Sequence, residues 1–303
     1  MRSMKVPRDR LMNPWLVLFL SIALPTWAQQ SPQAPSPMIE TTRPHPRIAQ
    51  AEPVGRRVDL QSLKGARVFA GPGVNTNKPV PLIVHFHGAS WLVETHIART
   101  LPNAVLITVN LGSGSSAYGK PFSDPTLFQA LIDEASQALH LKRGWSSVTL
   151  SGFSAGYGAV RAILRQEKNF ALVNNVLLLD GMHASYSPEG KILADGGTVN
   201  GADLDSFVKF AQEAVAGRKT FVFSHSEIFP GSYASTTECG DYVLAGVGLR
   251  VRPQLKNGPM GMQQLSVADG GRLHFIGYAG NTAPDHVDHL QAMPAWLKML
   301  HIK

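Results

Sequence analysis

The architecture of this chain is indicated first by the stretch Ser147-Val148-Thr149-Leu150-Ser151-Gly152-Phe153-Ser154-Ala155-Gly156, which a helix-prone run over residues 157–166 follows. An apolar, strand-like run leads directly into the pentapeptide G-x-S-x-G. The serine of such a pentapeptide sits in a strained strand-to-helix turn, where side chains two positions before and after it would collide with neighbouring backbone. The stretch therefore predicts a nucleophile elbow with Ser154 as the nucleophile, and it makes a serine hydrolase the first hypothesis.

Apolar runs and helix-like segments alternate from residue 54 onward. Several of the strand runs are continuously apolar, as is typical of strands that helices cover on both faces of a parallel sheet. The alternation predicts a single α/β domain over residues 54–303, with a doubly wound, mostly parallel sheet and helices on both faces. The expected strands are 67–70, 81–86, 104–110, 147–152, 175–180, 220–224 and 272–278, and the expected helices are 91–100, 125–140, 155–168, 203–216, 234–247 and 288–301.

Size and charge limit the possible classes of protein. With 303 residues, 44% hydrophobic and 16% charged, the chain is long enough to bury one large core. The formal net charge is +7, and residues 1–28 hold four basic side chains and one acidic one, a net +3, which leaves about +4 for the remainder. Since no block of five or six like charges occurs, we do not expect a nucleic-acid surface.

The N-terminal residues have the pattern of an export signal. Basic side chains precede an apolar run over residues 15–24, and small residues then end at Ala28, which predicts a secretory signal peptide over residues 1–28. The apolar run is shorter than the roughly 20 residues that span a bilayer. Residues 29–53 hold six prolines among polar residues and are expected to form an extended linker. We therefore expect a periplasmic or secreted protein with no stable membrane span after cleavage.

A second motif lies upstream, where Val84-His85-Phe86-His87-Gly88-Ala89-Ser90 ends an apolar strand and precedes a helix. Together with the elbow, it resembles the α/β-hydrolase family, in which the corresponding strand ends in His-Gly and donates backbone N–H groups to an oxyanion. The resemblance covers residues 60–303 and implies the α/β-hydrolase fold. It also implies an oxyanion hole made by the amides of Ala89 and Ala155, with Ser90 as the alternative to Ala89. We interpret His85 and His87 as partners of backbone groups near the strand end.

A serine hydroxyl needs a base to take its proton. The family places this histidine after the last strand, where the chain reads Asp285-His286-Val287-Asp288-His289. We favour His286, which we expect in a loop, over His289, which we expect at the start of the terminal helix. The same residues have the composition of a metal site, but no matching set of ligands appears elsewhere at a telling spacing, so we expect neither a metal nor a cofactor.

Two acids are candidates for orienting the histidine. Asp180 ends the expected strand 175–180, and Glu227 follows the expected strand 220–224. The usual family arrangement takes the acid after the later strand, which points to Glu227, whereas a minority takes it after the earlier strand, which points to Asp180. Both satisfy the chain order serine, acid, histidine. We favour Asp180 because aspartate is the commoner acid and because it sits directly at a strand end.

Aromatic residues near the expected strand ends are candidates for binding substrate, and we name Trp91, Phe153 and Tyr186. Together, the motifs favour an exported serine hydrolase that cleaves a carboxylic ester of a small molecule or of a polymer. The same residues would serve an amidase or a peptidase. A non-catalytic binding domain of this fold is a further alternative, although it would not need the complete set. The single cysteine, Cys239, has no disulfide partner within the chain, and we interpret it as a small buried or half-exposed thiol rather than a catalytic cysteine.

Overall fold

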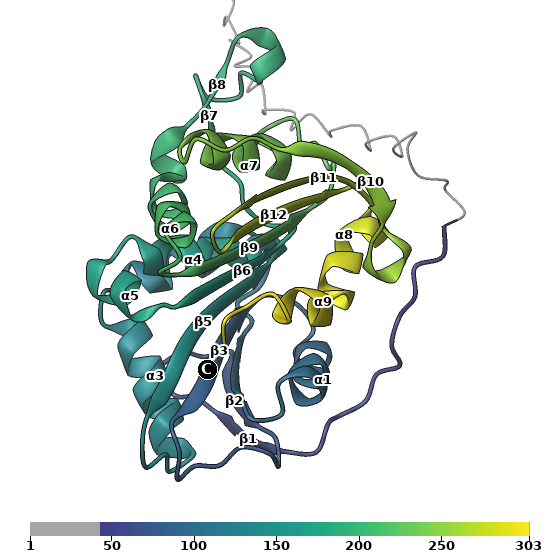
Figure 1. Cartoon of the computed structure of the whole chain (residues 1–303). Helices are drawn as coiled ribbons and strands as arrows, with labels where there is room; N and C mark the ends of the chain where they lie inside the picture. Colours follow the sequence, from purple (N-terminus) through teal and green to yellow (C-terminus); the bar gives the residue numbers. More distant parts are fainter. Residues whose placement is uncertain (1–42, 303) are drawn as a thin grey trace, which may run out of the picture. The chain divides into compact units, whose positions relative to one another are not determined.

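The computed structural model describes residues 43–302, which form a ten-stranded sheet in the order β1-β2-β4-β3-β5-β6-β9-β12-β11-β10 (Figure 1). The five pairings from β4 to β12 are parallel, and the outer pairings on both sides are antiparallel. The strands are β1 (Arg56–Asp59), β2 (Ala66–Ala70), β3 (Val80–Phe86), β4 (Val105–Val109), β5 (Trp145–Phe153), β6 (Asn175–Leu179), β9 (Thr220–His225), β10 (Arg252–Asn257), β11 (Gln263–Gly270) and β12 (Leu273–Tyr278).

Helices cover both faces of this sheet (Figure 1). They are α1 (Ser90–Thr100), α2 (Ser115–Gly119), α3 (Leu127–Ala138), α4 (Tyr157–Leu164), α5 (Glu167–Leu172), α6 (Asp205–Val215), α7 (Thr236–Ala245), α8 (Ala283–Gln291) and α9 (Met293–Leu297). A small hairpin of β7 (Tyr186–Ser187) and β8 (Thr198–Val199) lies between β6 and α6. The predicted α/β class with helices on both faces is confirmed.

Alternate side chains of the central strands enter two different hydrophobic clusters. Leu82 and Val84 of β3 pack with residues of α3, α4, α6 and α7, whereas Ile83 packs with residues of α1, α8 and α9. The cause is the two-residue period of a strand, which turns successive side chains to opposite faces. Because both faces are covered, the central strands are mostly apolar, and polar residues inside them, such as Thr149 and Ser151 of β5, are buried and hydrogen-bonded.

All seven expected strands are present, but the sequence did not predict β1, β10, β11 or the β7–β8 hairpin. The strand β10, which reads RPQLKN, shows why. It is an exposed edge of the sheet, so most of its side chains are polar or charged and the strand has no apolar period. The strands of the hairpin have only two residues each, which is too short for any periodic signal.

The prediction of one terminal helix over residues 288–301 was wrong. The helix α8 begins at Ala283, and a second helix, α9, follows it from Met293. A capping box fixes this start, because the side chain of Thr282 accepts a hydrogen bond from the amide of Asp285 while the Asp285 carboxylate accepts one from the amide of Thr282. His286 therefore lies in the first turn of a helix and not in a loop.

The expected linker over residues 29–53 is described from residue 43 onward, and the expected signal peptide lies outside the described residues. Residues 43–53 form no helix or strand, but a short part of them, residues 43–47, binds α8; we call this part the N-terminal strap. Arg43 Nη2 lies 2.7 Å from Asp285 Oδ1 and 2.6 Å from Asp288 Oδ2. Arg47 and His45 also bind Asp288, whose side chain is 0% exposed. The strap thus supplies the positive charge that this buried carboxylate requires.

Among residues 43–302, no helix combines the length and the apolar character that crossing a membrane would take.

Replacing both strap arginines tests this role. We expect Arg43→Gln with Arg47→Gln to lower the free energy of unfolding by about 3–5 kcal/mol, because Asp288 would remain buried without a full charge partner. Urea denaturation of the variant and the wild type measures the difference. Adding Asp288→Asn should recover part of the loss, and Arg143→Gln, at an exposed arginine before β5, should change nothing. An unchanged urea midpoint in the double variant would contradict the assignment.

Candidate active site

Ser154 follows the last residue of β5 and opens a short 3-10 turn, Ser154–Gly156, that continues into α4. Close packing holds this turn on both sides. A Cβ atom on Gly156 would collide with the carbonyl oxygen of Phe86 at the end of β3, and one on Gly181 would collide with the backbone of Ser154. The predicted elbow is therefore fixed between the carboxyl ends of β3 and β6, the neighbours of β5 in the sheet.

Backbone strain gathers at this edge of the sheet. Five non-glycine residues of the described chain have a positive φ angle, and three of them follow the adjacent strands β3, β5 and β6. They are His87 with 71°, Ser154 with 49° and Asp180 with 44°. Each such conformation costs on the order of 1–3 kcal/mol and persists only where the surroundings enforce it. Strain of this kind is concentrated at functional sites, and here it falls on residues that the sequence had already singled out.

His286 and Asp180 form a direct pair. His286 Nδ1 lies 2.7 Å from Asp180 Oδ2, and the two side chains are 25% and 2% exposed. The imidazole also stacks on Phe153, the residue before Ser154, with ring centroids 4.5 Å apart. Ser226 fixes the carboxylate from the other side, since its amide and its hydroxyl donate to Asp180 at 2.7 and 2.8 Å. The structure thus brings the favoured base and the favoured acid together beside the elbow.

The charge of Asp180 determines the tautomer of His286. Burial raises the pKa of this carboxyl, but the neighbouring His289 and the hydrogen bonds from His286 and the Ser226 amide outweigh that effect and hold the pKa below its usual range. An ionised carboxylate can only accept hydrogen bonds, so Nδ1 of His286 carries the proton and donates a hydrogen bond to Asp180. The other ring nitrogen, Nε2, then carries the lone pair that a general base needs.

The two alternative residues have other partners. Glu227 accepts a hydrogen bond from the amide of Gly280 at 3.2 Å, and its own amide donates to the Gly280 carbonyl at 2.9 Å, which ties the loop after β9 to the loop after β12. His289 is 1% exposed, and its Nδ1 lies 2.9 Å from the Ser224 hydroxyl. Burial lowers the pKa of His289 to about 4 and keeps this ring neutral. His289 is therefore a core residue beneath the site.

The predicted oxyanion turn is held by His85. Its Nε2 donates to the carbonyl of His87 at 2.8 Å, and its Nδ1 accepts from the Ser151 hydroxyl at 2.9 Å. Burial lowers the pKa of His85 to about 4, so the ring is neutral and has the one donor and one acceptor that these contacts require. Gly88 follows with a φ of 114°, and α1 then begins after Ala89. As we expected, His85 serves the backbone.

The amides of Ala89 and Ala155 belong to two neighbouring turns. Ala155 is the second residue of the helical turn after β5, and the first amides of a helix have no acceptor within it. The contact between Gly156 and Phe86 brings this turn against the end of β3, where the His87–Ala89 turn starts. The structure therefore places both predicted oxyanion donors on turns that meet beside Ser154. Ser90, the alternative donor, is the first residue of α1 and accepts a hydrogen bond from Asn110 through its hydroxyl.

A pocket of about 500 Å³ adjoins Ser154. It includes Tyr157 and Arg161, which the sequence analysis did not single out, although both lie on the helix that follows the elbow and are four residues apart, so they share one face. His183, which follows Asp180 by three residues, also lines it. The complete lining is Gly114, Ser115, Ser154, Ala155, Tyr157, Arg161, His183, Ala184, Ser185, Asp203 and Tyr233.

The three aromatic residues predicted to bind substrate lie in different places. Phe153 stacks between the rings of His87 and His286, with centroid distances of 6.0 and 4.5 Å. Trp91 packs against the hydrophobic cluster under α1, and Tyr186 is buried, with its hydroxyl donating to Glu238 at 2.9 Å. None of the three is among the described residues that line the pocket at Ser154.

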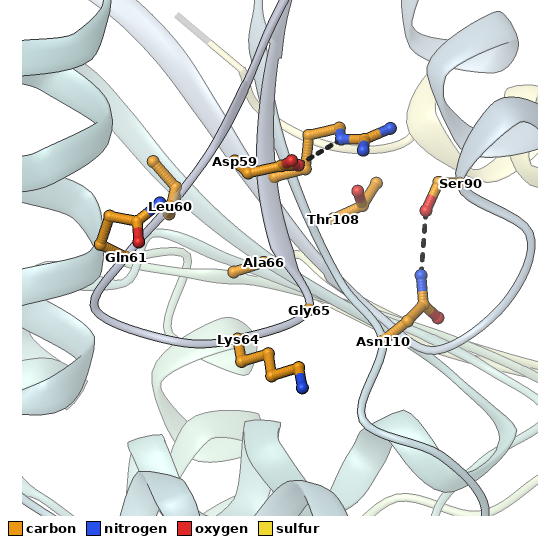
Figure 2. Close-up of a pocket in the computed structure, with 10 residues that line it drawn as sticks. Asp59, Leu60, Gln61, Lys64, Gly65, Ala66, Ser90, Thr108 and Asn110 are labelled. Carbon is orange, nitrogen blue, oxygen red and sulfur yellow. Dashed lines mark hydrogen bonds and ion pairs between the residues drawn. The ribbon is translucent and has the colours of Figure 1, made fainter.

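A second cavity, of about 600 Å³, lies beside β1, β2 and β4 (Figure 2). Asn110 donates to the hydroxyl of Ser90 at 2.9 Å on one side of it, and Arg67 pairs with Asp59 at 2.7 Å on the other. Its lining includes none of the proposed catalytic residues. Of the two, only the smaller pocket is lined by Ser154.

The side chains of the two aspartates and two histidines after β12 do not point to one common site. Asp285 and Asp288 bind the strap, His286 binds Asp180, and His289 binds Ser224. Ligand atoms of His45, Asp285 and Asp288 do lie within 4.8 Å of one another. However, the guanidinium groups of the strap already bind both carboxylates, so positive charge is present where a cation would sit.

Cys239 lies in α7 with its side chain fully buried. Burial raises the pKa of this thiol to about 12. A thiol must ionise to act as a nucleophile, so Cys239 is a core residue, and of the two expected environments the buried one is correct.

The strand order and the serine in the turn after a central strand define the α/β-hydrolase fold, and the predicted resemblance is confirmed at the level of the fold. No protein-family model matches the sequence, and a search of curated proteins found no match.

Similar solved structures include a mutant of the feruloyl esterase module from Clostridium thermocellum, complexed with sinapinate, at 13% identity over 82% of this chain and 89% of that chain, with a TM-score of 0.44. One of two fungal esterases from Rhizomucor miehei has 12% identity over 81% of both chains and a TM-score of 0.43. The acylaminoacyl peptidase of Pyrococcus horikoshii has 12% identity over 81% of this chain and 41% of that chain, with a TM-score of 0.45. These are similarities in the path of the chain, and the fold itself rests on the strand order.

Proposed function

We propose that this protein is an exported serine hydrolase that cleaves a carboxylic ester. The observation that carries the proposal is the hydrogen bond between His286 Nδ1 and the buried carboxylate of Asp180, at 2.7 Å, beside the strained turn of Ser154. Acyl transfer requires a serine, a histidine that can take its proton and an ionised acid that fixes the tautomer of the histidine. These three groups lie together here.

The reaction follows from these positions. His286 Nε2 takes the proton of the Ser154 hydroxyl while the serine oxygen attacks the ester carbonyl. The resulting oxyanion accepts hydrogen bonds from the amides of Ala89 and Ala155, each worth about 3–4 kcal/mol of transition-state stabilisation in measured cases. His286 then returns the proton to the leaving alcohol, and an acyl group remains on Ser154. Water, activated by His286, hydrolyses this acyl-enzyme and frees the serine.

Two other functions would use the same pocket. An amide or peptide bond could be cleaved by the same residues, and a panel of matched esters and amides separates these activities. A domain that only binds a ligand would gain nothing from strain at three strand ends or from an ionised aspartate buried against a histidine, both of which cost stability. This cost favours catalysis over binding alone.

Labelling with a fluorophosphonate probe tests the nucleophile. We expect the wild type to be labelled at a single site, Ser154→Ala not to be labelled, and His286→Ala to be labelled at least about 10³-fold more slowly, because the serine would lose its base. Mass spectrometry of the labelled protein identifies the residue. Labelling that persists in Ser154→Ala, or a folded wild type that does not react, would refute the proposal.

Paired substitutions test the acid. We expect Asp180→Asn to lower kcat by about 10⁴-fold, because an amide no longer selects the required tautomer of His286. The matched control, Glu227→Gln, should change kcat by less than about tenfold, since Glu227 binds the Gly280 amide. Steady-state hydrolysis of 4-nitrophenyl acetate measures both variants. A large loss of kcat in Glu227→Gln together with a small one in Asp180→Asn would identify Glu227 as the acid instead.

Export is part of the proposal and rests on the sequence of residues 1–28. In a host with a secretory pathway we expect the protein in the periplasm or medium, with Gln29 as its first residue. Mass spectrometry of the N-terminal peptide checks this, and an intact N-terminus on cell-associated protein would contradict it. No cofactor and no nucleic acid is part of the proposed reaction.

A further inference from the structure

Arg161 stands in the wall of the pocket that contains Ser154, with 20% of its side chain exposed. It projects from α4, and its guanidinium carbon lies 5.3 Å from the ring centroid of Tyr157 one turn earlier. The hydroxyl of Tyr157 donates in turn to Ser115 of α2 at 3.1 Å. The ring therefore holds the guanidinium in place without using any of its N–H groups.

Most donors of Arg161 are unused. Its Nη1 lies 3.3 Å from Asp203 Oδ1 and 3.4 Å from the carbonyl of His183, and both distances are near the outer limit for a hydrogen bond. Among the described residues, its Nη2 and Nε have no hydrogen-bond partner. A guanidinium carries five N–H donors, so Arg161 has a positive charge and unused N–H donors that a ligand in the pocket can bind.

Asp203 uses only part of this capacity, because its shortest hydrogen bonds go to another residue. Its Oδ2 accepts hydrogen bonds from the amide and the hydroxyl of Ser185 at 2.9 and 2.8 Å. Its Oδ1 lies 3.8 Å from Nη2 of Arg165 as well as 3.3 Å from Arg161. The Asp203 carboxylate thus lies at a long distance from both Arg161 and Arg165, and its short hydrogen bonds are those to Ser185.

A basic groove continues from the pocket past Arg161. Its volume is about 460 Å³, and it shares Ser115 and Arg161 with the pocket at Ser154. Within the described chain, no acidic side chain lines this groove. The lining is Ser115, Ser116, Gly119, Lys120, Ser123, Gly158, Arg161, Ala162, Arg165 and Gln166. Three cations with serine hydroxyls and an amide between them suit a ligand that carries negative charges and hydroxyl groups.

Resting on the proposed hydrolase function, we propose that the substrate bears a carboxylate that Arg161 binds next to Ser154, and that an acidic, hydroxyl-rich sugar chain continues into the groove along Lys120 and Arg165. The carboxylate would accept the free Nη2 and Nε hydrogens side by side, the geometry in which a guanidinium binds a carboxylate best. The hydroxyls of Ser115, Ser116 and Ser123 would bind hydroxyl groups of the chain.

Two pairs of matched esters test the carboxylate. In the first pair, 4-nitrophenyl hydrogen adipate and 4-nitrophenyl methyl adipate, the charge is on the acyl side; in the second, 4-acetoxybenzoate and its methyl ester, it is on the leaving group. We expect the wild type to prefer the charged member of at least one pair in kcat/KM. Arg161→Gln should lower that preference by about 10- to 100-fold, the effect of losing a hydrogen bond to a charged group. Arg143→Gln should leave the preference unchanged.

Asp203→Asn gives a change of the opposite sign. Removing the carboxylate that competes for Arg161 should raise the preference for the charged ester by about threefold to tenfold, while the asparagine still accepts a hydrogen bond from Ser185. A folding defect would not raise a preference, so this variant decides the matter even if Arg161→Gln does not fold. A preference that neither substitution moves, or a wild type that hydrolyses both members of each pair equally, overturns the inference.

Protection of Ser154 from the fluorophosphonate tests the groove. Polygalacturonate should slow labelling of the wild type at low salt, dextran should not, and Lys120→Gln with Arg165→Gln should weaken the protection about fivefold or more. Protection should also fade at 0.5 M salt, where exposed charges are screened. Equal protection by dextran, or none by polygalacturonate, rejects the groove as a site for an acidic chain. A wild type that neither reacts with the probe nor hydrolyses any ester would instead reject the hydrolase function itself.

Discussion

The buried carboxylate of Asp180 is the interaction on which the arrangement of the site depends. A charge this far from water must be met by donors, and here they come from segments that are distant in the sequence. Ser226, in the loop after β9, donates twice, and His286 donates from α8. Because an unpaired buried charge would cost several kcal/mol, these segments are held to one geometry. The same geometry places the imidazole over Phe153, next to the elbow.

The helix α8 is held from two sides by charge. His286 faces Asp180, while Asp285 and Asp288 on the same helix bind the strap of residues 43–47. The Asp288 carboxylate has no exposed surface, and α8 is only nine residues long. Without the arginines of the strap, this buried charge would destabilise the helix. The strap therefore acts on the position of His286 through α8, without touching the site. This also explains why a proline-rich segment with no helix or strand has charged residues at 43 and 47.

The features of the fold and the site that could be predicted from the sequence are those that depend on residues close together in the chain. The elbow is a local pattern, so Ser154 was recognisable, and the central strands were found because burial on both faces leaves continuous apolar runs. The start of α8 was missed although Thr282 and Asp285 form a capping box, since the aspartate takes the place that glutamate or glutamine usually has. The choice between Asp180 and Glu227 depends on contacts with residues 286 and 280, and such contacts across the fold leave no local trace.

The position of Arg161 follows from the elbow itself. Seven residues separate it from Ser154, and at about 1.5 Å per residue they place its backbone roughly 11 Å along the helix from the nucleophile. Helical side chains lean towards the N-terminus, so the guanidinium reaches back towards Ser154 and shortens this separation. A carboxylate bound there would lie several bonds from the scissile ester, about the length of an adipoyl chain or one sugar ring. In the proposed complex, the helix after Ser154 would therefore set the distance between the ester bond of the substrate and the carboxylate of the substrate.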